Sequence, residues 1–539
     1  MAGTLSPELV AELGYRDLDP AMAPAFCRWL AGGRKISPDA LSNVALVAES
    51  LRSREMADLL APLFPRVRNA GARAAFVRAL WAARHPEARS IGRQVLVTAT
   101  TVEIADAGAL ALAGGGASDC DLIATVLESH PEFTILGKRM AGCDRSRARH
   151  HFERWLSSGG TRSAIKYAAR EGLGDLGDAP AAETLARVVE LESNGKIRTC
   201  AVETASAIGG PRVRGAVLAR LRDDPATSIW IWAAARLGLV EAIPHLVKTV
   251  TGNAPARARR DALCALGLLD AKGERAVMTR ALASEDPQVC QAAAWALAQL
   301  ERSGAPAREV VERLVVLATS SRDQEGIGAW ALGRLRHSGS ADHLRALLTE
   351  LSTGPNTRSS GRLAMVAFAL GEIGDRQSAD TLKRLASDRT RSLVVREAAT
   401  AAVERLGEGP RDRTEASPPG DGRGGTWHPV LPLVPFVRTG IFLHAGESAT
   451  IYARGAWSYP GNPGGQLVHE SPDHPPGLPE LRLQGCVETQ WHRVYGHRKR
   501  LQFHRSGELV LTPYRPMITI ADAVPLGQMA GMARVLVEP

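Results

Sequence analysis

Apolar residues in the first 408 positions follow the period of an α-helix. They recur at i, i+3, i+4 and i+7 within short segments that end near glycine. The clearest pair of segments is AAREGLGDLGDAPAAETLARVVELE (168–192) and AMVAFALGEIGDRQSADTLKRLASD (364–388). Each predicts a helix ending in Leu-Gly-x-Ile/Leu-Gly-Asp, a short turn and a second helix. We expect Gly371 to adopt the left-handed conformation that ends the first helix of its pair.

This two-helix unit recurs along the chain. Weaker copies lie at 204–224, 234–250, 262–282, 293–300 and 329–348, and looser ones within 40–160. One helix pair cannot bury its apolar stripe alone, whereas stacked pairs can, so the pattern predicts a right-handed α-solenoid of roughly eleven or twelve units. We interpret residues 1–39 as a divergent helical cap and 40–408 as the solenoid, with stacked antiparallel helix pairs and no sheet over 161–408.

The repeated unit resembles the short HEAT repeats of phycobilin lyase-like proteins, most closely over residues 161–408. That resemblance implies a scaffold whose surface binds another protein. HEAT-type iron hydroxylases hold two metals through repeated His-Glu dipeptides. The one His-Glu in this chain is His469-Glu470, beyond the solenoid, so we do not expect that chemistry.

The amino-acid composition changes at residues 409–425, GPRDRTEASPPGDGRGG, which divide the chain. We interpret this segment as a flexible linker. After the linker, GIFLHAGESATIYARG (440–455) alternates in polarity and predicts two short strands around an Ala-Gly-Glu turn. Further strands are expected at 481–487, 508–512 and 533–537. Short strands with frequent Pro and Gly favour a β-sandwich over 426–539. The fold class is therefore multidomain: an all-α HEAT-type solenoid followed by an all-β sandwich.

Three motifs of the C-terminal part, taken in order, resemble the small bacterial galactophilic lectins, which are calcium-dependent β-sandwiches. They are FVRTGIFLHAGESATIYARGAWSY (436–459), DHPPGL (473–478) and GELVLTP (507–513). The resemblance implies that the Tyr459 carbonyl faces calcium and that His474 and Pro475 contact a sugar. We add Asp473 beside them and Trp457 as an apolar platform for a sugar face.

The calcium ligands of that family are only partly matched. The family takes its other ligands from Asp, Thr and an Asn pair in the loop before the last strand. Here that loop holds Asp522 and Thr519 but no Asn pair. We therefore expect no cofactor, with a calcium ion held by Tyr459 and Asp522 as the alternative.

Composition limits the class of protein. The chain has 539 residues, 45% hydrophobic and 5% aromatic, which excludes wholesale disorder and predicts a core of Ala, Leu and Val. Its seven cysteines include no CxxC pair, so reduced thiols are expected rather than a disulfide framework.

No stretch reaches about 18 uninterrupted apolar residues, and no leader pattern opens the chain. We expect no membrane span and a cytoplasmic location.

Two functions compete for the solenoid. Residues 1–408 hold 53 basic and 46 acidic residues, and Trp81, Trp230, Trp232, Trp295 and Trp330 lie in first helices. These features allow a nucleic-acid-binding HEAT protein of a bacterial defence or repair system. We instead interpret Trp295 and Trp330 as core, and the arginine clusters (Arg257, Arg259 and Arg260; Arg334 and Arg336) as solvated faces.

The chain shows no nucleophile elbow, P-loop or dinucleotide fingerprint, so we expect no enzyme activity. The favoured function is a non-enzymatic interaction scaffold. Its solenoid would bind a protein partner, and its lectin-like domain would recognise a galactoside, another glycan or a second surface.

Overall fold

The structure is a computed structural model of residues 1–539. It describes 23–31 and 44–407, apart from 46, 50, 52, 68, 193, 301–305, 322, 324–325 and 354–359, together with nine strands between 426 and 538 and residues 444 and 447. The predicted cap (1–39) is described only over helix α2, Ala23–Ala31, and the predicted linker (409–425) lies outside the described residues.

The helical part divides into two compact units, Met1–Thr204 and a second beginning at Ala205, so that the boundary falls within helix α13. The helices of the first unit, after α2, are α4 (Arg54–Leu60), η2 (Ala61–Arg66), α5 (Ala70–Ala82), α6 (Ala88–Val97), α7 (Val102–Ala111), α8 (Ala117–Ser129), α9 (Leu136–Ala141), α10 (Arg145–Ser157), α11 (Ser163–Leu176), α12 (Ala179–Leu191) and α13 (Gly195–Ile208).

The second unit continues the same alternation of helices. They are α14 (Pro211–Asp223), α15 (Ser228–Arg236), η3 (Val240–Ala242), α16 (Ile243–Thr251), α17 (Ala256–Leu268), η4 (Lys272–Glu274), α18 (Arg275–Ala281), α19 (Pro287–Leu300), α20 (Arg308–Thr319), α21 (Ile327–Arg334), η6 (Ser338–Ser340), α22 (Ala341–Thr353), α23 (Ser360–Ile373), η7 (Arg376–Ser378), α24 (Ala379–Ser387) and α25 (Leu393–Arg405).

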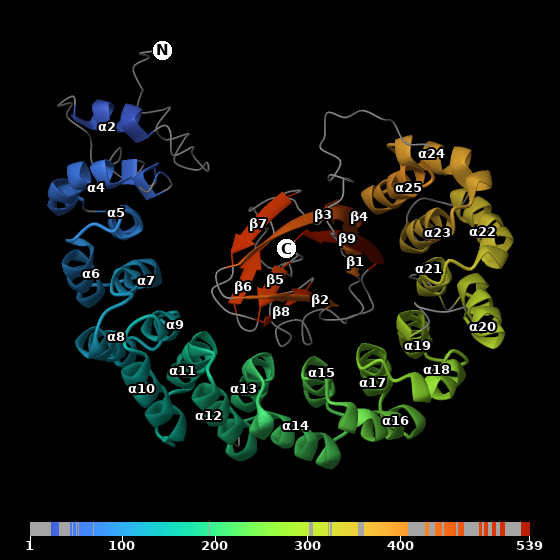
Figure 1. Cartoon of the computed structure of the whole chain (residues 1–539), viewed down its shortest axis with the longest axis horizontal. Coiled ribbons are helices and arrows are strands. Elements are labelled where there is room, and N and C mark those ends of the chain that lie inside the picture. The colour runs from blue at the N-terminus through green and yellow to red at the C-terminus, as the bar shows by residue number, and fades with distance from the viewer. Residues whose placement is uncertain are drawn as a thin grey trace. The chain divides into compact units, whose positions relative to one another are not determined.

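Within each unit the helices form two rows (Figure 1). From α5 to α11 and from α15 to α25, odd-numbered helices pack on the next odd-numbered helix, as α17 does on α19 and α23 on α25, and each also packs on an even-numbered neighbour in the chain. No strand occurs in the described residues of 161–408, so the predicted helical solenoid is confirmed. Alanine fills the closest contacts, and every Ala from 292 to 298 in α19 is buried.

Most turns that follow odd-numbered helices contain a residue with positive φ, but Gly371 is not one of them. Gly371 lies inside α23, and the left-handed residue is Gly374, with φ 81°. Our assignment of Gly371 as the helix cap is therefore wrong by one turn. In other repeats Asp270 (φ 52°) and Arg336 (φ 50°) occupy the turn, so glycine is favoured there without being obligatory.

In the C-terminal part the structure describes nine strands: β1 (Thr426–Val430), β2 (Val437–Leu443), β3 (Ser448–Tyr459), β4 (Asn462–Leu467), β5 (Gln484–Val487), β6 (Gln490–Arg493), β7 (Arg498–Gln502), β8 (Gly507–Thr512) and β9 (Ala530–Glu538). One sheet has the order β1-β9-β3-β4, with β7 also paired to β3, and the other has the order β2-β8-β5-β6. All described pairs are antiparallel.

The two strands expected around the Ala-Gly-Glu turn are β2 and β3. They do not pair with each other, because β2 joins β8 in one sheet while β3 joins β9 in the other. The buried side chains described here, Leu443 in β2, Ala449 in β3, and Leu509 and Leu511 in β8, come from both sheets. A sandwich arrangement of the two sheets remains a prediction.

Candidate interaction surface

The predicted ligand residues of the C-terminal part are described only in β3. There Tyr459 lies opposite Asn462 of β4, and Trp457 lies opposite Gln466 of β4 and Gly531 of β9. Asp473, His474, Pro475 and Asp522, together with Thr519, lie outside the described residues. Whether these residues converge on a sugar or a calcium ion therefore remains a prediction.

The tryptophans of the solenoid are mostly core residues. Trp230 and Trp232 in α15, Trp295 in α19 and Trp330 in α21 are buried, which confirms the packing role expected of Trp295 and Trp330. Trp81 in α5 differs, because 40% of it is exposed. Of these five rings, Trp81 alone offers a large accessible face.

The arginine clusters were only partly assigned correctly. Arg257 and Arg336 are exposed, as expected of a solvated face. Arg260 is buried, and its Nε and Nη2 donate to Asp261 Oδ1 at 2.9 and 2.6 Å while its Nη1 donates to Gln288 Oε1 at 3.3 Å. The adjacent buried carboxylate neutralises Arg260, which explains why it tolerates the interior.

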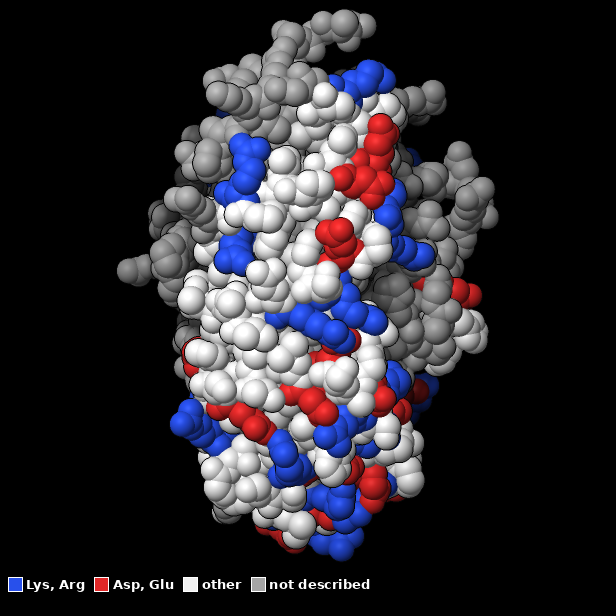
Figure 2. Space-filling view, turned by 90° about the vertical axis from the view of Figure 1, so that its left-hand side faces the viewer, with Lys and Arg blue, Asp and Glu red and all other residues white. Residues whose placement is uncertain are grey.

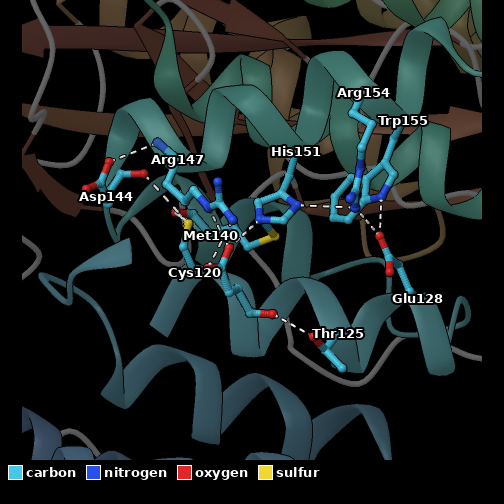
Figure 3. A network of polar contacts seen from close by, with 10 residues as sticks. Cys120, Thr125, Glu128, Met140, Asp144, Arg147, His151, Arg154 and Trp155 are labelled. Carbon is cyan, nitrogen blue, oxygen red and sulfur yellow. Dashed lines mark hydrogen bonds and ion pairs between the residues drawn. The ribbon is translucent and has the colours of Figure 1, made fainter. Parts of the chain in front are cut away.

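In the first unit, Arg–carboxylate contacts join consecutive even-numbered helices. Asp121 of α8 accepts hydrogen bonds from Arg147 Nε at 2.6 Å and His151 Nε2 at 2.7 Å, both from α10. These two bonds hold the pKa of Asp121 below its usual value. Two turns further along α8, Glu128 accepts from Arg154 and, at 2.7 Å, from Trp155 Nε1 (Figure 3).

The same pairing extends to the preceding helix, since Asp119 of α8 is buried and accepts from Arg93 of α6 at 2.6 Å. Basic and acidic side chains accordingly intermingle on the face shown in Figure 2. This face therefore lacks the extended field of one sign that attracts a polyphosphate backbone.

A second series of polar contacts links the odd-numbered helices. Arg139 of α9 donates to Asp106 of α7 at 2.6 Å, and the neighbouring Lys138 Nζ lies 2.8 Å from Glu171 Oε2 of α11. Glu171 also bonds Arg170, whose Nη1 donates to Thr204 Oγ1 of α13 at 2.7 Å. Burial acts to raise the pKa of Glu171, but the charges of Arg170 and Lys138 outweigh it and the pKa is lowered.

Tyr167 lies on this series and carries its accessible aromatic surface. The Arg170 guanidinium stands 4.5 Å from the centre of the Tyr167 ring, while 40% of Tyr167 remains exposed. Tyr167 was not among the residues expected to bind a ligand or partner. The sequence did carry one indication of an exposed ring, because Tyr167 lies off the apolar stripe of its helix. Ile165, Ala168 and Ala169 form that stripe and are buried, whereas Tyr167 is not.

The thiols of Cys120 and Cys143 in the first unit are buried. Burial raises the pKa of Cys120 to about 12 and that of Cys143 to about 11, which leaves both thiols protonated and unreactive. No group of three or more His, Cys, Asp and Glu side chains among the described residues is placed to hold a metal ion.

Residues 363–388, which form most of α23 with η7 and α24, match the PBS lyase HEAT-like repeat. The chain therefore contains a HEAT-like repeat within a helical solenoid. No curated protein matches the chain. In the part of the chain that the structure describes, no helix combines the length and the apolar character needed to cross a bilayer.

Several solved structures are similar to the helical part at low identity. An engineered protein is 20% identical, and the match covers 69% of this chain and 99% of the engineered chain with a TM-score of 0.30. Kap121p bound to Pho4p is 13% identical with a TM-score of 0.43, and Kap121p bound to the SUMO protease Ulp1p is 13% identical with a TM-score of 0.44. Each covers 74% of this chain, which spans 53% of the Kap121p chains.

Proposed function

We propose that the helical part is a non-enzymatic scaffold that binds a protein partner along the odd-numbered helices of its first unit. The observation that carries the proposal is the exposure of two large aromatic residues on that row, Trp81 and Tyr167, each at 40%. Exposed Trp and Tyr side chains are the residue types most enriched at the energetic centres of protein interfaces.

The pairing of charges around these rings also favours a protein partner. Carboxylates engage Arg139, Lys138 and Arg170 on the odd-numbered row, so these three cations are already paired and are not free to neutralise successive phosphates. A protein surface, in contrast, presents apolar side chains that gain by covering Trp81 and Tyr167. The proposed scaffold works in the cytoplasm, where thiols such as Cys120 stay reduced.

Cross-linking in the native cell tests the proposal. The full chain, Trp81→Ala, Tyr167→Ala and the control Val316→Ala would be compared, since Val316 is exposed on the even-numbered helix α20. We expect one reproducible protein partner, identified by mass spectrometry, whose yield falls in the two aromatic variants and not in the control. Equal yields from all four proteins would overturn the proposal.

A nucleic-acid-binding function is the alternative, and salt titration separates it from protein binding. Binding through phosphates weakens steeply as salt rises, because neutralised phosphates release counterions. We expect the full chain to bind duplex and single-stranded DNA weakly. A tight, steeply salt-dependent complex would favour the defence or repair function.

For the C-terminal part, we propose a lectin-like β-sandwich that recognises a galactoside or another glycan through Trp457, Tyr459, Asp473, His474 and Pro475. The ordered motifs of 436–459, 473–478 and 507–513 support this proposal, as do two antiparallel sheets.

Galactosides would be titrated into the full chain with calcium, with a chelator, and into His474→Ala. We expect weak binding that the chelator leaves intact and His474→Ala removes. Absence of binding to any glycan on an array would leave a protein-docking module instead.

A further inference from the structure

We infer that the Tyr167 platform, formed by Tyr167 and Arg170 with Glu171, Lys138 and Thr204, binds an acidic segment of the partner protein that carries an apolar anchor side chain. This inference rests on the proposed scaffold function and specifies which part of the partner the platform recognises.

The platform presents one aromatic surface on a fixed support. Arg170 is buried and lies against the Tyr167 ring at 4.5 Å, so that Tyr167 rests on the guanidinium and exposes 40% of its surface. Such a ring can take a Leu or Phe side chain from a partner without first losing contacts of its own. The cation–π contact with Arg170 fixes the ring further.

Bonds to three helices hold the support in place. Arg170 in α11 donates to Thr204 in α13 and bonds Glu171, and Glu171 in turn bonds Lys138 in α9. Because these side chains are already ordered, a partner that docks here loses little conformational entropy from the scaffold side. Pre-organised aromatic residues of this kind form effective anchors in protein interfaces.

The charge around the ring favours carboxylates on the partner. Helices α5, α7, α9, α11 and α13 together carry eight basic and five acidic residues. Cys200 lies beside the platform and interacts electrostatically with Arg170, Glu203, Glu171 and Lys196. Both of these glutamates are engaged in contacts within the protein and are largely covered, whereas Lys196 is exposed. Of these four charged side chains, the exposed one is therefore the cation Lys196.

A single-stranded nucleic acid fits this surface less well than a peptide. Recognition of single strands uses successive bases stacked on closely spaced aromatic rings along a basic groove. Here the two exposed rings of the row belong to α5 and α11, with α7 and α9 between them in the row. One exposed ring, on a row that also presents the exposed Lys196 of α13, suits one apolar side chain next to carboxylates.

Fluorescence anisotropy with the full chain tests the inference. The probe is a labelled peptide of about twelve residues built from Glu with two Leu, compared with its Lys/Leu counterpart and with an oligothymidylate of similar length. Variants are Tyr167→Ala, Tyr167→Phe, Lys196→Glu and the control Val316→Ala. Of the three probes, we expect only the acidic peptide to bind. Its affinity should be about tenfold weaker for Tyr167→Ala than for the parent chain, and that of Tyr167→Phe should lie within about twofold of the parent. Lys196→Glu should weaken binding severalfold, and Val316→Ala should not.

Equal binding of the acidic peptide by the parent chain and Tyr167→Ala would overturn the inference, as would no binding of the acidic peptide or preference for the basic one. Preferred binding of the oligonucleotide would replace it with a nucleic-acid site. None of these results decides the scaffold function itself, because the yield of native partner from Trp81→Ala is measured separately. A partner lost from Trp81→Ala but retained by Tyr167→Ala would leave the scaffold in place without this platform.

Discussion

Gly371 of α23 and Ala402 of α25 approach so closely that no side chain fits between them. A Cβ atom added to Gly371 would lie 2.6 Å from Ala402 Cα and 2.7 Å from Ala402 Cβ. The contact recurs along the odd-numbered row, because a Cβ on Gly333 would lie 2.5 Å from Ala369 Cα, and one on Gly267 2.9 Å from Ala296 Cα. Glycine on one helix and alanine on the next therefore set the close packing of successive repeats.

Gly371→Ala should destabilise the solenoid because the added methyl group must push α23 and α25 apart. The expected loss is about 1–3 kcal/mol of unfolding free energy, even though alanine is the better helix former. Urea unfolding followed by helical circular dichroism measures the change.

Two glycine variants serve as controls for that measurement. Gly215→Ala in α14 adds a Cβ that meets nothing within 4 Å, so it should be neutral or stabilise by about 0.5–1 kcal/mol. Gly374→Ala also has open space, but its φ of 81° should cost about 1 kcal/mol. If Gly371→Ala behaved like Gly215→Ala, the close approach of α23 to α25 would be wrong.

Arg405→Ala should destabilise more than the loss of an ordinary surface arginine. Arg405 Nη1 lies 3.0 Å from Glu372 Oε1, and the Glu372 side chain is only 2% exposed. Removing the cation leaves a buried carboxylate poorly compensated, which costs about 3 kcal/mol. In the double variant Glu372→Gln/Arg405→Ala much of that loss should be recovered. Additive losses in the double variant would show that the pair is not coupled.

Asp323 should make the fold less stable as pH rises from about 4 to 6. It is fully buried, and its carboxylate accepts from Ile327 N at 2.7 Å and Gly328 N at 2.9 Å at the start of α21. Burial raises the pKa of Asp323 to about 6, against bonds from these amides and the charge of Arg362 that lower it. Between pH 4 and pH 6, Asp323 therefore keeps its proton in the folded state but has lost it in the unfolded state. The contribution of Asp323 to stability is fully present below pH 4, decreases as pH rises, and is lost above pH 6.

Asp323→Asn removes the titrating carboxyl group and tests whether Asp323 destabilises the fold as pH rises. The stability of the variant relative to the parent should rise by up to ~3 kcal/mol between pH 4 and pH 7. Comparing urea midpoints of the two proteins across this range cancels the contributions of all other titrating groups. A difference that stays constant with pH would show that Asp323 does not titrate there.

The buried thiols should resist alkylation in the folded chain. Burial raises the pKa of Cys120, Cys143 and Cys264, so thiolate is scarce at pH 8. In a Cys486→Ser background, we expect iodoacetamide to label these positions only after denaturation, as read by mass spectrometry. Rapid labelling of native Cys120 would instead indicate local opening of α8.

Helix formation is a property of short segments, and the sequence alone predicted it well. The apolar period and the Leu-Gly-x-Leu/Ile-Gly-Asp unit placed a helix pair at 168–192, where α11 and α12 lie, and another at 364–388. Strands were anticipated near β2, β3, β5, β8 and β9, while β1, β4, β6 and β7 were not, because short strands without clear alternation carry little local signal.

Tertiary structure alone decided which residue of each type performs which task. Gly371 and Gly374 stand three positions apart in one motif, yet one packs on Ala402 and the other reverses the chain. Similarly, Trp295 is buried while Trp81 is exposed, although both occupy odd-numbered helices. These differences arise from neighbours in the adjacent repeat, tens of residues away in sequence, and burial against them is invisible to any local pattern. The Tyr167 platform emerges for the same reason, since Thr204, Glu171 and Lys138 meet only when three helices stack.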